Sequence, residues 1–348
     1  QAAGVLPLVG QWNTHTYSAT TQARSQISAL CKEQGIRLWM SEVGSGGSGI
    51  AGNLNLAQKL MDDIRYIMPV AWVDWQYVEE GNDQWCLVQG DFTKQTYHKV
   101  KNYSIRQHFS KFIRPGYTFL TSLNGQTLAA RNPEGDSLII VAINPNALPV
   151  VHRADLSFYE SISSELTALR SSETEDLSPT ADYTLEDRIL TYKLPAYSIV
   201  TFVIPVEESA DADNAIRPGL PYWICPRNVA DQALQASGGK VTLQPLSYAP
   251  EQTWKLQPDG NGYTFTNGNG DILTEHSPDY ALGYEPSPQG GQTFTLTPID
   301  RLFYKIMTED GSKAFDLEGE HHTASTTVGL WEYGSAPTAC HRHWFFMR

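Results

Sequence analysis

Glu42 combines a residue type and a position that suit covalent chemistry. It closes the apolar run of residues 38–41 (LWMS), and the loop that follows, residues 44–47, is rich in glycine and serine. This pattern is typical of a buried parallel strand in a barrel of alternating strands and helices, where catalytic groups lie at the C-terminal ends of strands. We therefore consider Glu42 a candidate nucleophile. The alternative is a strand-end carboxylate that caps the next helix or pairs with an arginine.

Polar aromatic side chains end the strand-like segment that precedes Glu42. Residues 10–17 finish with His15 and Tyr17, which alternate and therefore share one side of the strand. On its own, His15 is more simply explained as a histidine whose hydrogen bonds are satisfied in the core or at the rim. Beside Tyr17 and upstream of Glu42, a role in a site is the favoured interpretation.

A third strand-like segment, residues 70–77, ends in Trp75 and Gln76, and the loop after it contains Trp85. These groups could line the same site as Glu42 if the strands are parallel neighbours. Two other tryptophans lie inside the predicted strands and are better explained by core packing: Trp39 and Trp72.

Amphipathic helices are predicted between these strands. The first carries the apolar stripe Ala23, Ile27, Leu30 and Cys31 after a cap at Thr20 or Thr21. The second has a stripe from residue 57 to residue 68 with Asn53 or Asn55 as its cap, and the third covers about residues 95–112. Strands separated by helices of this length predict parallel βαβ units.

Three such units cannot close a barrel, which takes eight units and about 250 residues. Residues 1–116 are therefore expected to form either part of a small open sheet or the last three βα units of a longer (β/α)8 catalytic domain.

The rest of the chain predicts two all-β domains. Residues 117–206 contain short segments rich in Val, Ile, Thr and Tyr, separated by turn signals, which predicts a β-sandwich. The acidic stretch 207–217 is a predicted linker. Residues 218–348 show a threefold repeat, in which QTW at 252–254 recurs as QTF at 292–294 and as RHW at 342–344. Three β repeats of this size predict a β-trefoil.

Composition limits the partners of the chain. The 348 residues carry a formal net charge of −13, which argues against nucleic acid or an anionic membrane as a partner. No apolar run approaches the ~20 residues that span a bilayer. The four cysteines have no metal-type spacing, and we expect neither a metal nor a cofactor. A disulfide between Cys225 and Cys340, near the two ends of the predicted trefoil, is left open.

Three motifs occur in a characteristic order: HTY at residues 15–17, WMSE at 39–42 and AWVDWQ at 71–76. Together they resemble glycoside hydrolase family 30, whose retaining enzymes combine a barrel with a fused side β-sandwich. The second and third motifs are most similar to its endo-β-1,6-galactanase branch. The resemblance covers about residues 5–205 and includes LPAYS at 194–198.

The resemblance implies that Glu42 is the nucleophile. It also implies that a set of polar and aromatic side chains binds the substrate around Glu42: His15, Tyr17, Trp75, Gln76 and Trp85.

One part of the family's machinery has no counterpart here. Retaining hydrolysis uses two carboxyl groups about 5–5.5 Å apart, and the family carries its acid/base in an Asn-Glu-Pro motif on an earlier strand. The sequence contains no Asn-Glu dipeptide. Asp74 should point away from the site toward the helices, and Glu79 and Glu80 lie on a loop where carboxylates are usually solvated. We expect the acid/base on a missing N-terminal barrel segment, from the same gene or from a second chain.

The C-terminal third resembles ricin-type carbohydrate-binding trefoils through its QxW-like triplets and the stretches AFDL at 314–317 and GLWEY at 329–333. The resemblance implies a sugar site at Asp316 and Trp331, with His341 as a possible addition. The alternative is a trefoil that has lost lectin activity and only stabilises the enzyme. His321, His322, His341 and His343 are interpreted as surface histidines and not as metal ligands.

These observations predict an exported protein, extracellular or periplasmic, that hydrolyses a β-linked polysaccharide. The competing hypothesis, from another class, is a non-catalytic carbohydrate-binding protein with a degenerate barrel remnant.

Overall fold

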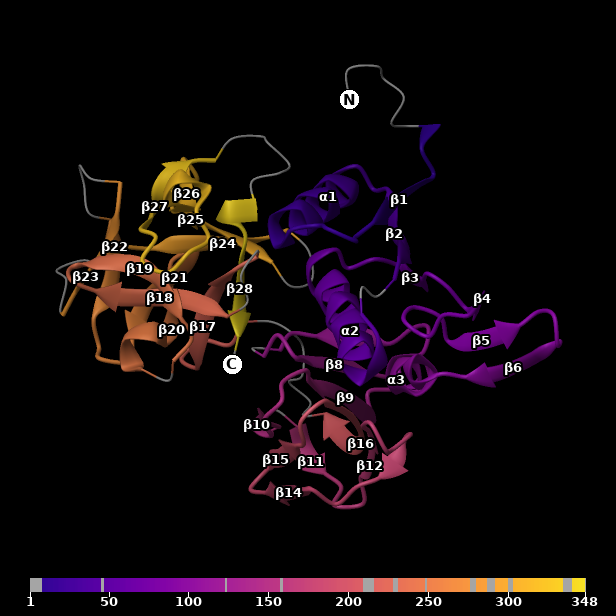
Figure 1. Cartoon of the computed structure of the whole chain (residues 1–348). Helices are drawn as coiled ribbons and strands as arrows, with labels where there is room; N and C mark the ends of the chain where they lie inside the picture. The colour runs from indigo at the N-terminus through magenta and orange to yellow at the C-terminus, as the bar shows by residue number, and fades with distance from the viewer. Residues whose placement is uncertain are drawn as a thin grey trace. The chain divides into compact units, whose positions relative to one another are not determined.

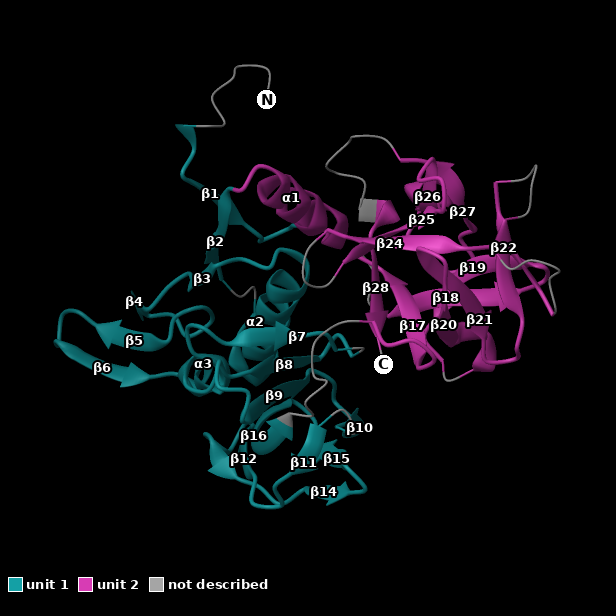
Figure 2. Ribbon diagram, turned by 180° about the vertical axis from the view of Figure 1, so that it is seen from behind, with its two compact units in different colours: residues 1–19, 36–213 teal, residues 20–35, 214–348 magenta. Residues whose placement is uncertain are grey.

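The computed structural model describes the greater part of the chain: residues 8–44, 47–122, 124–156, 159–208, 216–227, 231–247, 249–275, 280–286, 292–299, 303–333 and 340–347. It divides into two compact units, which Figure 2 colours separately: residues 1–19 with 36–213, and residues 20–35 with 214–348. Each unit is described by itself. Among the described residues, no helix has the length and apolar character needed to cross a bilayer.

A three-stranded parallel sheet carries the candidate nucleophile in unit 1. Its strands are β1 (Gln11–His15), β2 (Arg37–Val43) and β3 (Ala71–Asp74), in the order β1-β2-β3. Trp12 pairs with Leu38, and Trp39 pairs with Ala71, so all three strands run in one direction. The predicted parallel arrangement of the nucleophile strand and the tryptophan strand is thus present, and their C-terminal ends share one edge.

Helices α2 (Gly49–Tyr66) and α3 (Lys101–Ser110) belong to unit 1. The N-cap of helix α2 is Ser48, five residues before Asn53, the first of the caps predicted from the sequence. Ala57, Leu60 and Met61 of its predicted stripe are buried. The helix ends at Tyr66, so Met68, the last member of the predicted stripe, lies beyond it.

The predicted helix over residues 95–112 is wrong in its first turn. Residues 96–99 form strand β6 (Thr96–Lys99), which pairs antiparallel with β5 (Val88–Asp91). Strand β4 (Val78–Glu80) adds to β5 in parallel. The turn between β5 and β6 forms because the Asp91 carboxylate accepts a 2.9 Å hydrogen bond from the Lys94 backbone amide. The hairpin of β5 and β6 projects from the rest of unit 1 (Figure 1).

A β-sandwich completes unit 1. A seven-stranded sheet has the path β13-β12-β16-β9-β8-β7, with β11 paired to β16, and a three-stranded sheet has the order β10-β15-β14. The strands are β7 (Thr118–Leu120), β8 (Thr127–Arg131), β9 (Ser137–Asn144), β10 (Val150–Asp155), β11 (Tyr159–Ile162), β12 (Thr167–Ser171), β13 (Ser178–Pro179), β14 (Tyr183–Glu186), β15 (Ile189–Leu194) and β16 (Ser198–Glu208).

Strand β9 explains why the sandwich and the helices form one unit. Its residues Leu138 and Ile140 pack into the sandwich core, while Ile139 and Val141 pack with helices α2 and α3. A strand covered on both faces reads as a continuous apolar run, as residues 138–143 do.

In its described residues, unit 2 consists of one α-helix, three short 3-10 helices and β-strands, and the strands fit a β-trefoil. They form a ten-stranded sheet and the separate hairpin β18-β19. The elements are β17 (Pro221–Pro226), β18 (Gln232–Ser237), β19 (Lys240–Pro245), η2 (Pro250–Gln252), β20 (Trp254–Asp259), β21 (Gly262–Asn267), β22 (Ile272–Glu275), β23 (Leu282–Glu285), β24 (Phe294–Pro298), β25 (Tyr304–Thr308), β26 (Lys313–Leu317), η3 (Glu318–Glu320), β27 (Val328–Glu332), η4 (Cys340–Arg342) and β28 (Trp344–Met347).

The three repeat triplets deliver equivalent aromatic residues to the core of unit 2. Trp254, Phe294 and Trp344 are fully buried in one cluster. The indole N–H of Trp254 donates to the Leu234 carbonyl and that of Trp344 to the Phe315 carbonyl, at 3.0 and 3.2 Å. The repeat seen in the sequence therefore reflects a repeated packing position.

Helix α1 (Thr21–Glu33), which connects β1 to β2 in the chain, groups with unit 2. Its N-cap is Thr20, one of the two predicted caps, whose hydroxyl accepts from the Ala23 backbone amide at 3.1 Å. The predicted apolar stripe is only partly right, because Ala23 is exposed whereas Ser28 is buried. The Ser28 hydroxyl accepts a 3.3 Å hydrogen bond from the Arg227 guanidinium, which no apolar pattern predicts.

Candidate active site

Glu42 lies at the end of β2, where a bulge sets its direction. The pairing with β1 passes from Thr14–Met40 directly to His15–Glu42, so Ser41 is an extra residue on β2. The pairing with β3 also shifts between Met40 and Val43. A bulge re-aims a side chain next to a functional site, and here it brings Glu42 level with His15.

The Glu42 carboxylate contacts two side chains from the β1 side. The Tyr17 hydroxyl donates to Oε1 at 2.8 Å, and His15 Nε2 lies 3.6 Å from Oε2. The rings of His15 and Tyr17 meet edge to face, with centroids 6.2 Å apart. The structure thus brings together three residues that the sequence analysis selected.

Tyr17 acts as a hydrogen-bond donor at ordinary pH. Burial raises its pKa to about 12, and the hydrogen bond to the Glu42 carboxylate and the charge of that carboxylate add to the shift. Glu42 remains accessible, with 27% of its side chain exposed.

Trp75 and Gln76 follow the end of β3. The Trp75 backbone amide donates to the Val43 carbonyl at 3.0 Å, which continues the β2–β3 pairing one residue past Glu42. The Trp75 side chain is 44% exposed, Gln76 is half-buried, and the peptide bond between them is cis. Trp75 therefore presents an aromatic surface at the edge of the sheet where Glu42 lies.

Trp85 is held beside the end of β2 through Gly44. A Cβ atom on Gly44 would lie 2.8 Å from the Trp75 carbonyl oxygen and 3.2 Å from Trp85 Cβ. Only glycine allows this approach, so the loop after β3 folds back onto the residue that follows Val43. The structure places Trp85 in the neighbourhood predicted from the sequence.

Asp74 is directed toward helix α3, as its alternation with Trp75 predicts. Its carboxylate binds the Arg106 guanidinium of α3 at 2.8 and 2.9 Å. Burial raises the pKa of Asp74, and the Arg106 charge opposes that shift. Glu80 accepts a 2.9 Å hydrogen bond from the Phe92 amide. These contacts give Asp74 and Glu80 structural roles in unit 1.

Asp63 was not selected from the sequence, although it binds one residue that lies between His15 and Tyr17 in the chain and one residue of β3. This fully buried residue of α2 accepts hydrogen bonds from the Thr16 hydroxyl at 2.8 Å and the Trp72 indole at 2.9 Å. Thr16 lies between the two residues that contact Glu42. The available signal was an acidic residue three positions after Leu60 of the predicted apolar stripe, which helical spacing puts on the buried side.

In unit 2, the residues predicted for a sugar site lie close together, but the Asp316 carboxylate already accepts hydrogen bonds from other residues of the protein. Its carboxylate accepts from Arg342 Nε and from the Tyr280 hydroxyl, both at 2.6 Å, and His341 Nε2 lies 3.3 Å away. Trp331 is 55% exposed and packs edge to face on Tyr280, with centroids 6.1 Å apart. Trp331 therefore provides the exposed aromatic surface, while Asp316 is 6% exposed.

Histidines and cysteines of unit 2 were also considered from the sequence. His341 and His343 were expected at the surface, but both are buried. His341 lies beside Asp316, and the two ring nitrogens of His343 lie within hydrogen-bond distance of Arg227 and Tyr333. Cys225 is a free, fully buried thiol, and the side chain of Cys340 lies outside the described residues. No three His, Cys, Asp or Glu residues of the described part form a group that could hold a metal ion.

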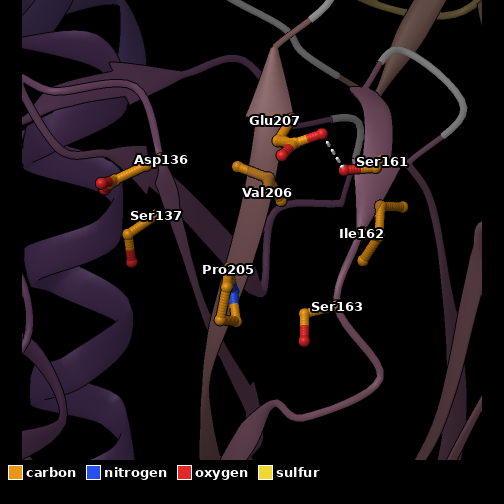
Figure 3. A pocket seen from close by; sticks show the side chains of 8 residues that line it. All are labelled: Asp136, Ser137, Ser161, Ile162, Ser163, Pro205, Val206 and Glu207. Carbon is orange, nitrogen blue, oxygen red and sulfur yellow. Dashed lines mark hydrogen bonds between the residues drawn. The ribbon is translucent and has the colours of Figure 1, made fainter.

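A shallow pocket of about 570 Å³ lies in the sandwich of unit 1 (Figure 3). Serines and two carboxylates line it, and the Ser161 hydroxyl donates to Glu207 at 2.6 Å. The pocket contains none of the residues selected from the sequence, and no aromatic side chain lines it.

Searches for similar proteins returned glycoside hydrolases. The chain is 29% identical over 138 residues to an endo-β-1,6-galactanase from Hypocrea rufa, covering 39% of this chain and 28% of that protein. It is 21% identical over a 428-residue alignment to an exo-β-1,6-galactobiohydrolase from Bifidobacterium longum subsp. longum, covering 95% and 28%. It is 33% identical over 209 residues to a glucuronoxylanase from Bacillus subtilis, covering 55% and 45%. The chain thus spans less than half the length of these curated relatives.

Among solved structures, a glycoside hydrolase family 30 subfamily 8 xylanase from Clostridium acetobutylicum aligns with a TM-score of 0.48 at 23% identity, covering 57% of this chain and 49% of that one. A ricin B-like lectin from Macrolepiota procera aligns with a TM-score of 0.34 at 18% identity, covering 38% and 99%. No protein-family model matches the chain. The sequence relatives make this chain a homologue of glycoside hydrolases that include galactanases and xylanases.

Proposed function

We propose that this chain carries the nucleophile of a retaining β-glycosidase that cleaves a β-1,6-galactan-type polysaccharide, with Glu42 as the nucleophile. The observation that carries the proposal is the carboxylate of Glu42 at the end of a parallel strand, with the Tyr17 hydroxyl at 2.8 Å and His15 at 3.6 Å. Strand ends of this kind are where barrel enzymes place catalytic groups.

In the proposed reaction the Glu42 carboxylate attacks the anomeric carbon while the glycosidic bond breaks, which gives a covalent glycosyl-enzyme that water then hydrolyses. Tyr17 donates its hydrogen bond to the carboxylate and orients it. Trp75 stacks on the C–H face of the sugar, and Gln76 and Trp85 complete the wall of the subsite. Each role uses a residue that lies at or just after the end of β1, β2 or β3, or in the loop after β3.

The reaction also needs a proton donor for the leaving oxygen, about 5–5.5 Å from the nucleophile in retaining enzymes. Asp74 is unsuited to this task because it is paired with Arg106 of α3. We place the acid/base Glu on a segment that completes the barrel, supplied by the same gene or by a second chain. Such a segment would also cover the outer edges of β1 and β3.

The names of two relatives, an endo-β-1,6-galactanase and an exo-β-1,6-galactobiohydrolase, support the galactan as substrate, and the motif WMSE supports the endo mode. In the same proposal, unit 2 holds the enzyme on its substrate through Trp331. The protein acts outside the cell, where such polysaccharides occur.

A covalent trap tests Glu42 without the acid/base. A 2,4-dinitrophenyl 2-deoxy-2-fluoro-β-galactoside has a leaving group that needs no proton, so the nucleophile alone suffices. We expect intact-mass analysis to show one added fluorogalactosyl group and peptide mapping to assign it to Glu42. Glu42→Gln should not be labelled, whereas Glu80→Gln, the control, should be labelled normally. Label on a different residue, or none, would contradict the assignment.

The second candidate function is a non-catalytic carbohydrate-binding protein, favoured by the exposed Trp331 beside Tyr280 in unit 2. Galactan binding and fluorogalactoside labelling, measured on the same protein, distinguish the glycosidase from the binding protein. A chain that binds galactan but remains unlabelled by the trap would be a binding protein.

A further inference from the structure

Exposed aromatic side chains in the described residues are concentrated in one segment. Among the large hydrophobic residues that are exposed in the described part, six are aromatic, and four of these lie between residues 75 and 97: Trp75, Tyr77, Phe92 and Tyr97. The other two are Tyr17 and Trp331. The segment begins at the candidate active site and ends on the projecting hairpin of β5 and β6. A clustered set of this kind, unlike scattered single residues, indicates a binding surface.

Phe92 and Tyr97 lie on the same face of the small sheet. Tyr97 pairs directly with Gly90 across the β5–β6 hairpin, so both point to one side. A Cβ on Gly90 would lie 2.7 Å from Cε1 of Phe92, so the Phe92 ring lies directly over this glycine. The two side chains therefore lie on one face of the hairpin, and Gly90 provides the room for the Phe92 ring.

The backbone holds Phe92 in this position. Glu80 pairs with Gly90 from the β4 side, and its carboxylate accepts a 2.9 Å hydrogen bond from the Phe92 amide. The outer ring surface remains free: Phe92 is 62% exposed and Tyr97 is 80% exposed. A ring with one side on the chain and the other toward solvent is a ready stacking surface.

We propose that Phe92 and Tyr97 form a second saccharide-binding platform, which binds the part of a β-linked polysaccharide that extends beyond the sugar in the Glu42 site. This inference rests on the proposed function and adds a subsite to it. Tyr77, 63% exposed, lies in the chain between Trp75 and β4 and links the two regions.

A saccharide fits this platform better than a protein partner does. The platform is small, and the exposed Glu80 and Lys99 share its face, whereas the centres of protein interfaces are large and depleted in such charges. A sugar ring presents C–H groups to an aromatic face and hydroxyl groups to charged neighbours at the edge. The net charge of −13 also suits a neutral ligand.

Binding of soluble β-1,6-galactan and of its disaccharide to the full chain tests the platform. All proteins carry Trp331→Ala, so that unit 2 does not mask the result. We expect the double variant Phe92→Ala/Tyr97→Ala to bind the polysaccharide at least about tenfold more weakly, with disaccharide affinity unchanged. Gly90→Ala should act in the same direction because it displaces the Phe92 ring. Phe92→Tyr keeps a ring and should keep binding, and Leu148→Ala, an exposed residue of the sandwich, is the matched control.

Equal polysaccharide affinity in the double variant would overturn the platform, and so would the absence of any binding by the parent. Labelling of Glu42 by the fluorogalactoside separates this test from the proposed function. A platform-dependent affinity without labelling would leave the platform standing and remove the catalytic assignment.

Discussion

The hydroxyl of Tyr17 and the carboxylate of Glu42 form a 2.8 Å hydrogen bond across 25 positions of the chain. The bond exists because β1 and β2 are parallel and because the bulge at Ser41 brings Glu42 level with His15. A donor fixed in this way orients one lone pair of the carboxylate and leaves the other oxygen beside His15, 3.6 Å away.

Removing that donor should slow the first chemical step. A hydrogen bond to a charged group contributes about 1.5–3 kcal/mol, so we expect Tyr17→Phe to lower the rate of Glu42 labelling by roughly tenfold to hundredfold. The rate is measured by the time course of the fluorogalactosyl mass shift. Tyr77→Phe, which removes a hydroxyl from another exposed tyrosine, is the control. Equal rates in the parent and in Tyr17→Phe would show that the hydrogen bond has no role in the attack.

Much of this site could be predicted from the sequence because the information is local. An apolar run that stops at Glu42 and a strand that ends in His15 and Tyr17 place three side chains on one edge, provided that the strands are parallel. The bulge at Ser41 could not be predicted, because nothing in the local sequence distinguishes a regular strand from one with an extra residue. The sequence therefore predicted that these three side chains share one edge of the sheet. It did not predict the bulge that sets the direction of Glu42.

Long-range contacts explain the errors. Residues 96–99 were included in the predicted helix over residues 95–112, but pairing with β5 makes them a strand. Asp316 looked like a free acceptor for a sugar until Tyr280 and Arg342, 36 and 26 positions away, were found to bind it. Secondary-structure propensity and the position of a motif depend on the local sequence. Strand partners and hydrogen-bond partners are set by the tertiary fold.

Gly44→Ala should disturb the wall of the site. The added methyl group would meet the Trp75 carbonyl at 2.8 Å and Trp85 Cβ at 3.2 Å, so one of them must move. Overpacking of this kind costs about 1–3 kcal/mol, and we expect a lower melting temperature, altered tryptophan fluorescence and slower labelling of Glu42. Gly10→Ala adds the same methyl group where no atom lies within 4 Å and should change none of the three. A Gly44→Ala protein with the parent's fluorescence and labelling rate would contradict the packing described for Trp85.

Asp63→Ala should destabilise unit 1 more than Asp63→Asn does. Alanine leaves the Thr16 hydroxyl and the Trp72 indole N–H without their acceptor, and each buried donor without a partner costs about 1–3 kcal/mol. Both donors reach the same oxygen, Oδ2, so the amide oxygen of asparagine can replace it. Urea unfolding monitored by fluorescence gives the free energies of unfolding, with the exposed Asp83→Ala as control. Equal losses in the two Asp63 variants would show that the charge matters and the two hydrogen bonds do not.

His108 should make unit 1 sensitive to acid. The ring is fully buried in α3, with Nδ1 at 2.8 Å from the Thr201 hydroxyl and Nε2 at 2.8 Å from the Ser171 hydroxyl. Burial lowers the pKa of His108 from its ordinary value of 6.5 to about 3. In the unfolded chain the histidine takes up its proton near pH 6.5, before the folded protein does. The contribution of His108 to the free energy of unfolding is therefore complete above that pH. It is lost as the pH falls toward 3, by at most about 1.4 kcal/mol per pH unit.

The variant His108→Gln isolates this contribution, because glutamine offers a donor and an acceptor but does not titrate in this range. Urea unfolding at a series of pH values from 7.5 to about 4 should show a free-energy difference between the parent and His108→Gln that shrinks as the pH falls. The contributions of the other titrating groups to the free energy of unfolding are the same in both proteins and cancel in that difference. His98→Gln, at an exposed position of β6, should leave the pH dependence of the parent unchanged. A constant difference across the series would mean that His108 is protonated in the folded protein as readily as in the unfolded chain, and that its burial between α3 and the sandwich is not as described.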